Sequence, residues 1–148
     1  GNDTAQVGFV VSDGGNADIS INANATGVVL SLLNTLEVVV QRWDSVNNTW
    51  TTVVDTGLPQ FANLLTLGAS GVTLNMTGLE NGQYRVLSYN TNLLATGSYT
   101  SLDVDVTETS AGTITAKIMR RASGAPKIRT VRSVARKING KLNAPQVV

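Results

Sequence analysis

Short apolar runs recur along the first 116 residues, and Gly, Asn, Asp and Ser separate them. Runs of this length bounded by turn residues are typical of β-strands. The pattern predicts strands at Val7 to Val11, Asp18 to Asn22, Thr35 to Asp44, Thr49 to Asp55, Gly71 to Met76, Gln83 to Tyr89 and Tyr99 to Glu108. About seven strands at this spacing favour an all-β fold, and specifically an immunoglobulin-like antiparallel β-sandwich over residues 1–116.

Three breaks between the runs carry turn chemistry, at Ser12 to Gly15, Asn47-Asn48 and Glu80 to Gly82. Their Gly, Asn and Asp residues accept positive φ angles or bond to their own backbone. The segment Val28 to Leu36 has apolar residues at both helical and strand spacing, so a short helix and a buried strand both remain open there.

Composition agrees with a β fold and narrows the chemistry. Asn, Thr, Gly, Val and Leu dominate residues 1–116, where straight-chain helix formers are scarce. The chain has no Cys and no His. It therefore lacks disulfides, thiolate or imidazole metal ligands, and every catalytic triad that needs a histidine. No enzyme activity and no cofactor are expected.

Charge is sorted by position along the chain. All ten acidic residues lie between Asp3 and Glu108, whereas nine of the eleven Lys and Arg residues lie between Lys117 and Lys141. Residues 1–116 therefore carry 2 − 10 = −8, and residues 117–148 carry +9. The near-neutral total hides a basic C-terminal extension, which we expect to be attracted to acidic surfaces, including the acidic body of this chain.

The extension admits three interpretations. Its cations could bind phosphates or other anions in a salt-dependent way. No aromatic residue lies among them, so a specific nucleic-acid partner is not expected. The candidate anion-binding residues are Arg120, Arg121, Lys127, Arg129, Arg132, Arg136, Lys137 and Lys141.

A second interpretation is a short amphipathic helix, because apolar residues from Val131 to Leu142 align at helical spacing and Asn139-Gly140 could end it. The favoured interpretation is a flexible or loosely docked extension, or the start of a following module. No apolar stretch approaches the length of a membrane span, so no span is expected.

Trp43 and Trp50 fall on one predicted hairpin. With Asn47-Asn48 as a two-residue turn, Ser45 pairs with Trp50 and Trp43 with Thr52, so both indoles share one face. The favoured interpretation is that they fill one end of the sandwich core. The alternative is a platform that stacks on sugar rings, which makes Trp43 and Trp50 the candidate ligand-binding residues.

Two groups of acidic residues are candidate sites. Asp103 and Asp105 lie two residues apart on the polar face of a strand, with Glu108 just beyond, and paired carboxylates at such a separation can serve a glycosidase. The favoured interpretation is a solvated strand face that resists aggregation. Calcium is the one metal to consider, at Asp13, Asn16 and Asp18, although this loop lacks the length and carboxylates of an EF-hand.

Several phrases of the sequence resemble a known family. They are Trp50-Thr51-Thr52-Val53, Gly71-Val72-Thr73-Leu74, the run from Gly78 to Leu87, and the run from Gly97 to Thr109. Together they resemble one module of the giant, repetitive biofilm-associated adhesins that Gram-negative bacteria export by type I secretion. The resemblance covers roughly residues 5 to 115. It implies an immunoglobulin-like sandwich arranged in series with others.

The resemblance also implies a function. Such a module is a non-catalytic spacer or adhesive unit at the bacterial cell surface, whose partners are the neighbouring modules of the same polypeptide and surface glycans or other cells. The C-terminal extension departs from the family, because basic residues stand where an acidic linker is usual. A linker stiffened by calcium is therefore not expected here.

Overall fold

The computed structural model describes residues 2–26, 34–57, 60–61, 69–92, 99–109, 112–120, 126–132, 136–138, 141–143 and 146–147. All the elements within these ranges are β-strands. The alternatives for Val28 to Leu36 fall largely outside the described residues, and Leu36 itself lies in a strand.

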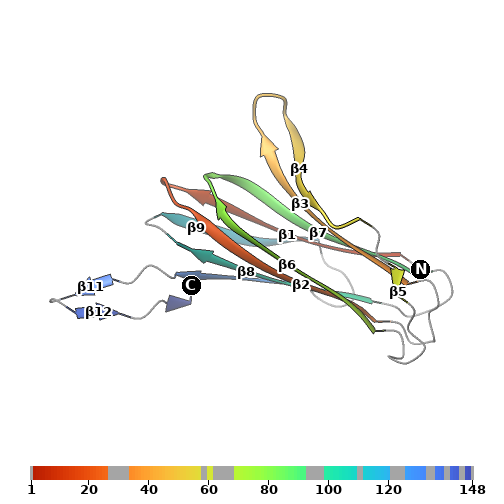
Figure 1. Cartoon of the computed structure of the whole chain (residues 1–148). Coiled ribbons are helices and arrows are strands. Elements are labelled where there is room, and N and C mark those ends of the chain that lie inside the picture. Colours follow the sequence, from red (N-terminus) through yellow and green to blue (C-terminus); the bar gives the residue numbers. More distant parts are fainter. Residues whose placement is uncertain are drawn as a thin grey trace.

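The strands form two sheets that pack face to face (Figure 1). The first sheet has the order β4 (Thr49–Asp55), β3 (Asn34–Asp44), β7 (Gly82–Asn92), β1 (Asn2–Ser12), β9 (Thr113–Arg120), and β5 (Gln60–Phe61) also pairs with β3. The second has the order β13 (Gln146–Val147), β10 (Lys127–Arg132), β8 (Tyr99–Glu108), β2 (Ala17–Thr26), β6 (Ala69–Leu79). A separate hairpin joins β11 (Arg136–Ile138) to β12 (Lys141–Asn143).

The core lies between the two sheets and follows from the alternation of the sequence. Every second side chain of a strand points inward, and these positions are apolar along the central strands except at Ser88 and Glu108. The most deeply buried side chains are Phe9, Ile21, Leu36, Leu102, Val7, Val11, Val38, Val40, Val86, Val104 and Val106. Phe9 stacks on Tyr84 with 5.1 Å between ring centroids, which ties β1 to β7 at one end of the core.

The predicted all-β sandwich is confirmed. Two strands, Thr49–Asp55 and Tyr99–Glu108, have the predicted bounds, and the other five extend beyond theirs. The pairings β2 with β6 and β3 with β7 match the inner pairs of an immunoglobulin sandwich. The positions of the first and last strands differ from the immunoglobulin order, in which the first strand pairs with the second and the last with the one before it. Here β1 pairs with β7 and β8 pairs with β2.

The C-terminal extension contributes two strands to the sandwich. β9 pairs antiparallel with β1 across the predicted boundary between residues 116 and 117. β10 pairs with β8 in parallel, from Lys127 opposite Asp103 to Arg132 opposite Glu108. The predicted amphipathic helix is wrong for the described part of this segment, which alternates as a strand in β10 and forms short strands in β11 and β12.

The first strand begins at one end of the sandwich, and β10 ends at the other, where β13 pairs with it. β1 begins where Asn2 lies opposite Thr91, at the end that also holds Thr26 and Tyr99. β10 ends at Arg132 beside Glu108, at the other end. Figure 1 shows the N-terminus at one end of the two sheets and β11 and β12 extending past the other.

Candidate functional site

Trp43 and Trp50 are direct cross-strand partners near the turn of the β3–β4 hairpin. Their ring centroids are 5.4 Å apart and their planes meet at 67°, an edge-to-face pair. The prediction that both indoles share a face is confirmed, but the predicted pairing of Trp43 with Thr52 is wrong. The turn has four residues, Ser45 to Asn48, in place of two.

Asp44 explains the longer turn. Its carboxylate accepts hydrogen bonds from the backbone N–H groups of Val46 at 2.9 Å and Asn47 at 3.2 Å, and from the Asn47 side chain at 2.8 Å. These bonds lower the pKa of Asp44, the side-chain bond from Asn47 most of all. Asn48 takes a left-handed φ of 52°, which asparagine tolerates better than most residues. An Asp-initiated turn therefore outcompetes the two-residue hairpin.

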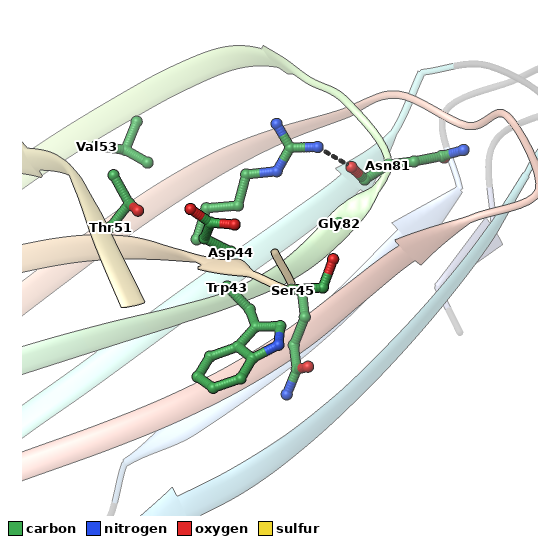
Figure 2. A pocket seen from close by; sticks show the side chains of 9 residues that line it. Trp43, Asp44, Ser45, Thr51, Val53, Asn81 and Gly82 are labelled. Atoms are coloured by element: carbon green, nitrogen blue, oxygen red, sulfur yellow. Dashed lines mark hydrogen bonds between the residues drawn. The ribbon is translucent and has the colours of Figure 1, made fainter. Parts of the chain in front are cut away.

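The favoured interpretation of the two tryptophans as core is wrong. The inward positions of β3 are Leu36, Val38 and Val40, so Trp43 falls on the opposite side by strand parity. Both indoles are half-buried on the outer face of the first sheet. Figure 2 shows Trp43 pointing away from Thr51 and Val53, which face the other side of the hairpin.

Arg85 completes this outer-face site. Its guanidinium lies over the Trp50 ring, 4.3 Å from the centroid, and its Nε donates to Gln41 Oε1 at 2.6 Å. Arg85 is not among the residues that the sequence pattern predicts for the site. The signal for it is the strand register, which places it opposite Gln41 and beside the tryptophans. We call Trp43, Trp50, Gln41 and Arg85 the tryptophan site.

A groove of about 610 Å³ opens on the other side of the same hairpin, between the hairpin and the β6–β7 turn (Figure 2). Arg42 crosses it, donates to the Asn81 carbonyl and lies 5.7 Å from the Tyr84 ring centroid. A Cβ at position 82 would lie 2.6 Å from Arg42 Nε, so Gly82 leaves room for this contact. The groove is thereby partly filled by the chain's own arginine.

The acidic residues of β8 face the basic residues of β10. Arg129 Nε contacts Asp105 Oδ1 at 3.1 Å, and Lys127 lies opposite Asp103 in the parallel ladder. Glu108 is only 4% exposed, and its Oε1 accepts the backbone N–H of Gly112 at 2.7 Å. Asp105 and Glu108 therefore have partners within the chain, and Asp103 lies opposite a lysine. A shallow hollow of about 380 Å³ lies beside them.

The three candidate calcium ligands, Asp13, Asn16 and Asp18, each form a hydrogen bond with a different segment of the chain. Asp13 Oδ2 accepts from the Thr113 hydroxyl at 2.8 Å, and Asp18 Oδ1 accepts from the Gly78 N–H at 2.9 Å. The Asn16 carbonyl accepts from the Thr109 N–H at 3.0 Å. Within the ranges that the structure describes, no three Asp, Glu, His or Cys side chains gather in a group that could hold a metal ion.

The remaining candidate cations are spread over several strands. Arg120 ends β9 and Arg132 ends β10, Arg136 and Lys137 lie in β11, and Lys141 begins β12. Arg121 lies outside the described residues. Three of the candidate cations, Lys127, Arg129 and Arg132, have strand positions that oppose acidic residues of β8.

No protein-family model matches the chain, and no curated protein matches it either. Within the described ranges, no helix is long and apolar enough to cross a membrane.

Proposed function

We propose that the chain is a non-catalytic structural or adhesive module of a large bacterial cell-surface adhesin that serves surface attachment or biofilm formation. The opposite placement of the chain's entry and exit carries the proposal. The first strand begins with Asn2 at one end of the sandwich, and the last described strand, β13, pairs with the end of β10 at the other end, so copies can be joined in series. The sequence phrases that resemble adhesin modules support the same interpretation.

The chemistry of the described side chains agrees with a structural role. The two grooves at the hairpin and at β8 are crossed or bordered by Arg42 and Arg129, each bound within the chain. The long strands supply stiffness, since an 11-residue strand such as β1 spans roughly 36 Å. The neighbouring modules of the same polypeptide are the primary partners in this proposal.

Antibodies raised against the chain test where it acts. We expect them to label intact cells of the source bacterium, and we expect a strain lacking the coding region to lose the label and to deposit less biofilm. Labelling that requires permeabilised cells would overturn the proposal, because a surface module must be accessible from outside. A strain with the region restored is the control.

Two copies joined end to end test the serial geometry. We expect small-angle X-ray scattering to give a maximum dimension about twice that of one copy, because each copy continues in the direction of the last. A maximum dimension close to that of one copy would show that the copies fold back on each other.

A second candidate function is glycan binding at the tryptophan site. Its position favours this function, because the indoles lie on an outer face and not in the core, and Arg85 adds a cation beside them. We expect iodide to quench both half-buried indoles, and a bound polyuronate to reduce that quenching. A neutral glucan is the comparison. Unchanged quenching with both polysaccharides would remove this candidate.

A further inference from the structure

The sandwich has open strand edges, and most of them are guarded. An edge strand exposes unpaired N–H and C=O groups, which invite pairing with another chain, and proteins protect such edges with charges, bulges or short strands. β9 carries Lys117 and Arg120 and has a register shift opposite Gln6 and Val7. β4 has a shift opposite Val40 and Gln41, and ends in Asp55.

The two edges of the second sheet differ sharply. At one edge, β13 covers only Val131 and Arg132 of β10, and β10 carries Lys127, Arg129 and Arg132 among its six residues. β6 lies at the other edge, is 11 residues long, and contains neither a charged residue nor a proline. Within the described part of the chain, no strand pairs with its outer side.

β6 is also regular over most of its length. Its pairing with β2 runs without a shift from Ala69 to Met76, and the bulge lies beyond, at Thr77 and Gly78. In that bulge Gly78 has a φ of 68° and its N–H is bound by Asp18. The segment from Ala69 to Met76 is therefore a straight, uncharged edge.

The side chains of this edge are apolar on one face and small or polar on the other. Val72, Leu74 and Met76 pack against the core but stay half-exposed, because no strand covers them on the open side. Gly71, Thr73 and Asn75 are exposed on the outer face. A strand added here would complete the burial of the three apolar residues and satisfy the open backbone groups.

We propose that β6 pairs antiparallel with β6 of a second copy of this chain, about a two-fold axis at Thr73. This axis pairs Ser70 to Met76 of each copy, which stays inside the regular segment. It sets Val72 opposite Leu74 on the core side and Thr73 opposite its own counterpart on the outer side. No like charges meet, and a two-fold contact is self-complementary.

The guarded edges limit the assembly. Each copy offers one unguarded edge among its described strands, so pairing stops at a dimer and does not extend into a fibre. A single strand pair buries less area than a standard interface, so the association is weak and depends on concentration. This inference does not depend on the proposed surface function.

Sedimentation velocity from micromolar to millimolar protein tests the proposal. We expect a monomer–dimer equilibrium in the full chain. Thr73→Lys sets two ammonium groups opposite each other and should raise the dimer Kd at least about tenfold. Thr52→Lys, on the edge strand β4 of the first sheet, is the matched control. Both threonines are exposed, and each is hydrogen-bonded to an amide side chain, at 3.0 Å for Thr73 with Asn22 and 3.2 Å for Thr52 with Gln41.

Cysteine cross-linking tests the register even where Thr73→Lys disturbs folding. The chain has no Cys, so Thr73→Cys adds one defined thiol. Residues directly opposite in an antiparallel pair have Cα atoms about 4.5 to 5.5 Å apart, within the range of a disulfide. We expect mild oxidation to give a covalent dimer much faster than in Thr52→Cys.

Three results would overturn the proposal. They are a wild-type chain that stays monomeric at every concentration, equal dimer affinity in Thr73→Lys and the wild type, and equal cross-linking of Thr73→Cys and Thr52→Cys. Oligomers that grow beyond the dimer would likewise contradict the claim that β6 is the only unguarded edge among the described strands.

Discussion

Glu37 of the first sheet lies in a different electrostatic setting from Asp105 and Glu108 of the second sheet. In the second sheet, Asp105 contacts Arg129, and buried Glu108 accepts a backbone N–H from the segment that leads into β9. In the first sheet, Glu37 and Asp55 lie on adjacent strands and share a hydrogen bond, although both are acids. Partial burial of Glu37 raises its pKa most, and the hydrogen bond and negative charge of Asp55 raise it further.

This contrast shows what the C-terminal strands do for the body. An acid stabilises the fold where the C-terminal segment brings a donor to it, as at Asp105 and Glu108, and opposes the fold where burial and a second carboxylate raise its pKa, as at Glu37. The basic extension is therefore part of the electrostatic balance of the second sheet.

Ending the chain after Arg120 should have the largest effect. The truncation removes β10, including Ile128 packed against the core and Thr130, which is 7% exposed. We expect the free energy of unfolding in urea to fall by about 2–4 kcal/mol, from lost apolar burial and from β8 losing its ladder partner. An unchanged unfolding curve would mean that β10 contributes nothing to the fold.

Trypsin gives an independent check on the same strand. We expect cleavage at Lys127 and Arg129 to be slow in low and high salt alike, because backbone pairing with β8 protects them. Protection that disappears in high salt would show that charge alone holds β10 in place.

Removing the Glu108 acceptor should have the next largest effect. Glu108→Ala leaves the Gly112 N–H without its 2.7 Å partner and should lower the free energy of unfolding by about 1–3 kcal/mol. Glu108→Gln keeps an acceptor oxygen and should cost less. Equal losses in both variants would assign the effect to charge and not to the hydrogen bond.

Arg129→Gln should have a smaller effect. The ion pair with Asp105 is exposed, at 59% and 42% for the two side chains, so solvent screens it. We expect a loss of about 0.5 kcal/mol at low ionic strength that shrinks as salt is added. A loss that is the same in high salt would point to the packing of the arginine stem.

Glu37→Gln should have the smallest effect, and the opposite sign. Because the folded pKa of Glu37 lies above its ordinary value of 4.5, the folded protein binds the proton more tightly, and stability falls as pH rises through the folded pKa. We expect Glu37→Gln to be more stable by a few tenths of a kcal/mol at neutral pH, with the gap closing below the ordinary pKa. A gap that persists in acid would contradict this sign.

The sequence is a good guide to the central strands and a poor one to the tail. Alternation and turn residues predict the bounds of β4 and β8 correctly, because each strand has a solvent-exposed face and is bounded by turn residues. β10 is missed because Lys127 and Arg129 suggest a solvated tail. Their two-residue spacing matches that of Asp103 and Asp105, which is a signal for a neighbouring strand, but the pairing depends on a crossover that no local pattern encodes.

The tryptophan site could be predicted in part. Any tight hairpin places Trp43 and Trp50 on one face of the sheet. Whether that face is the core face or the outer face depends on strand parity relative to Val40, which points into the core. The turn length depends on Asp44, because its hydrogen bonds with Val46 and Asn47 stabilise a four-residue turn over a two-residue turn at Asn47-Asn48. Arg85 lies on β7, 85 − 50 = 35 positions after Trp50, so only the fold brings it to the indoles.

The opposite ends of the chain have a mechanical consequence. Tension applied through Asn2 and through the segment after Arg132 runs along the strand axes, so it loads the ladders of β1 and β10 in shear and not by peeling. β13 doubles back on β10 through only two residue pairs, so a pull from the C-terminal side releases it before β10 is loaded. β1 is then held by two neighbours, whereas β10 is held only by its six residue pairs with β8. Under load we expect β10 to slip before β1, so that the module lengthens at its C-terminal side while its core stays folded.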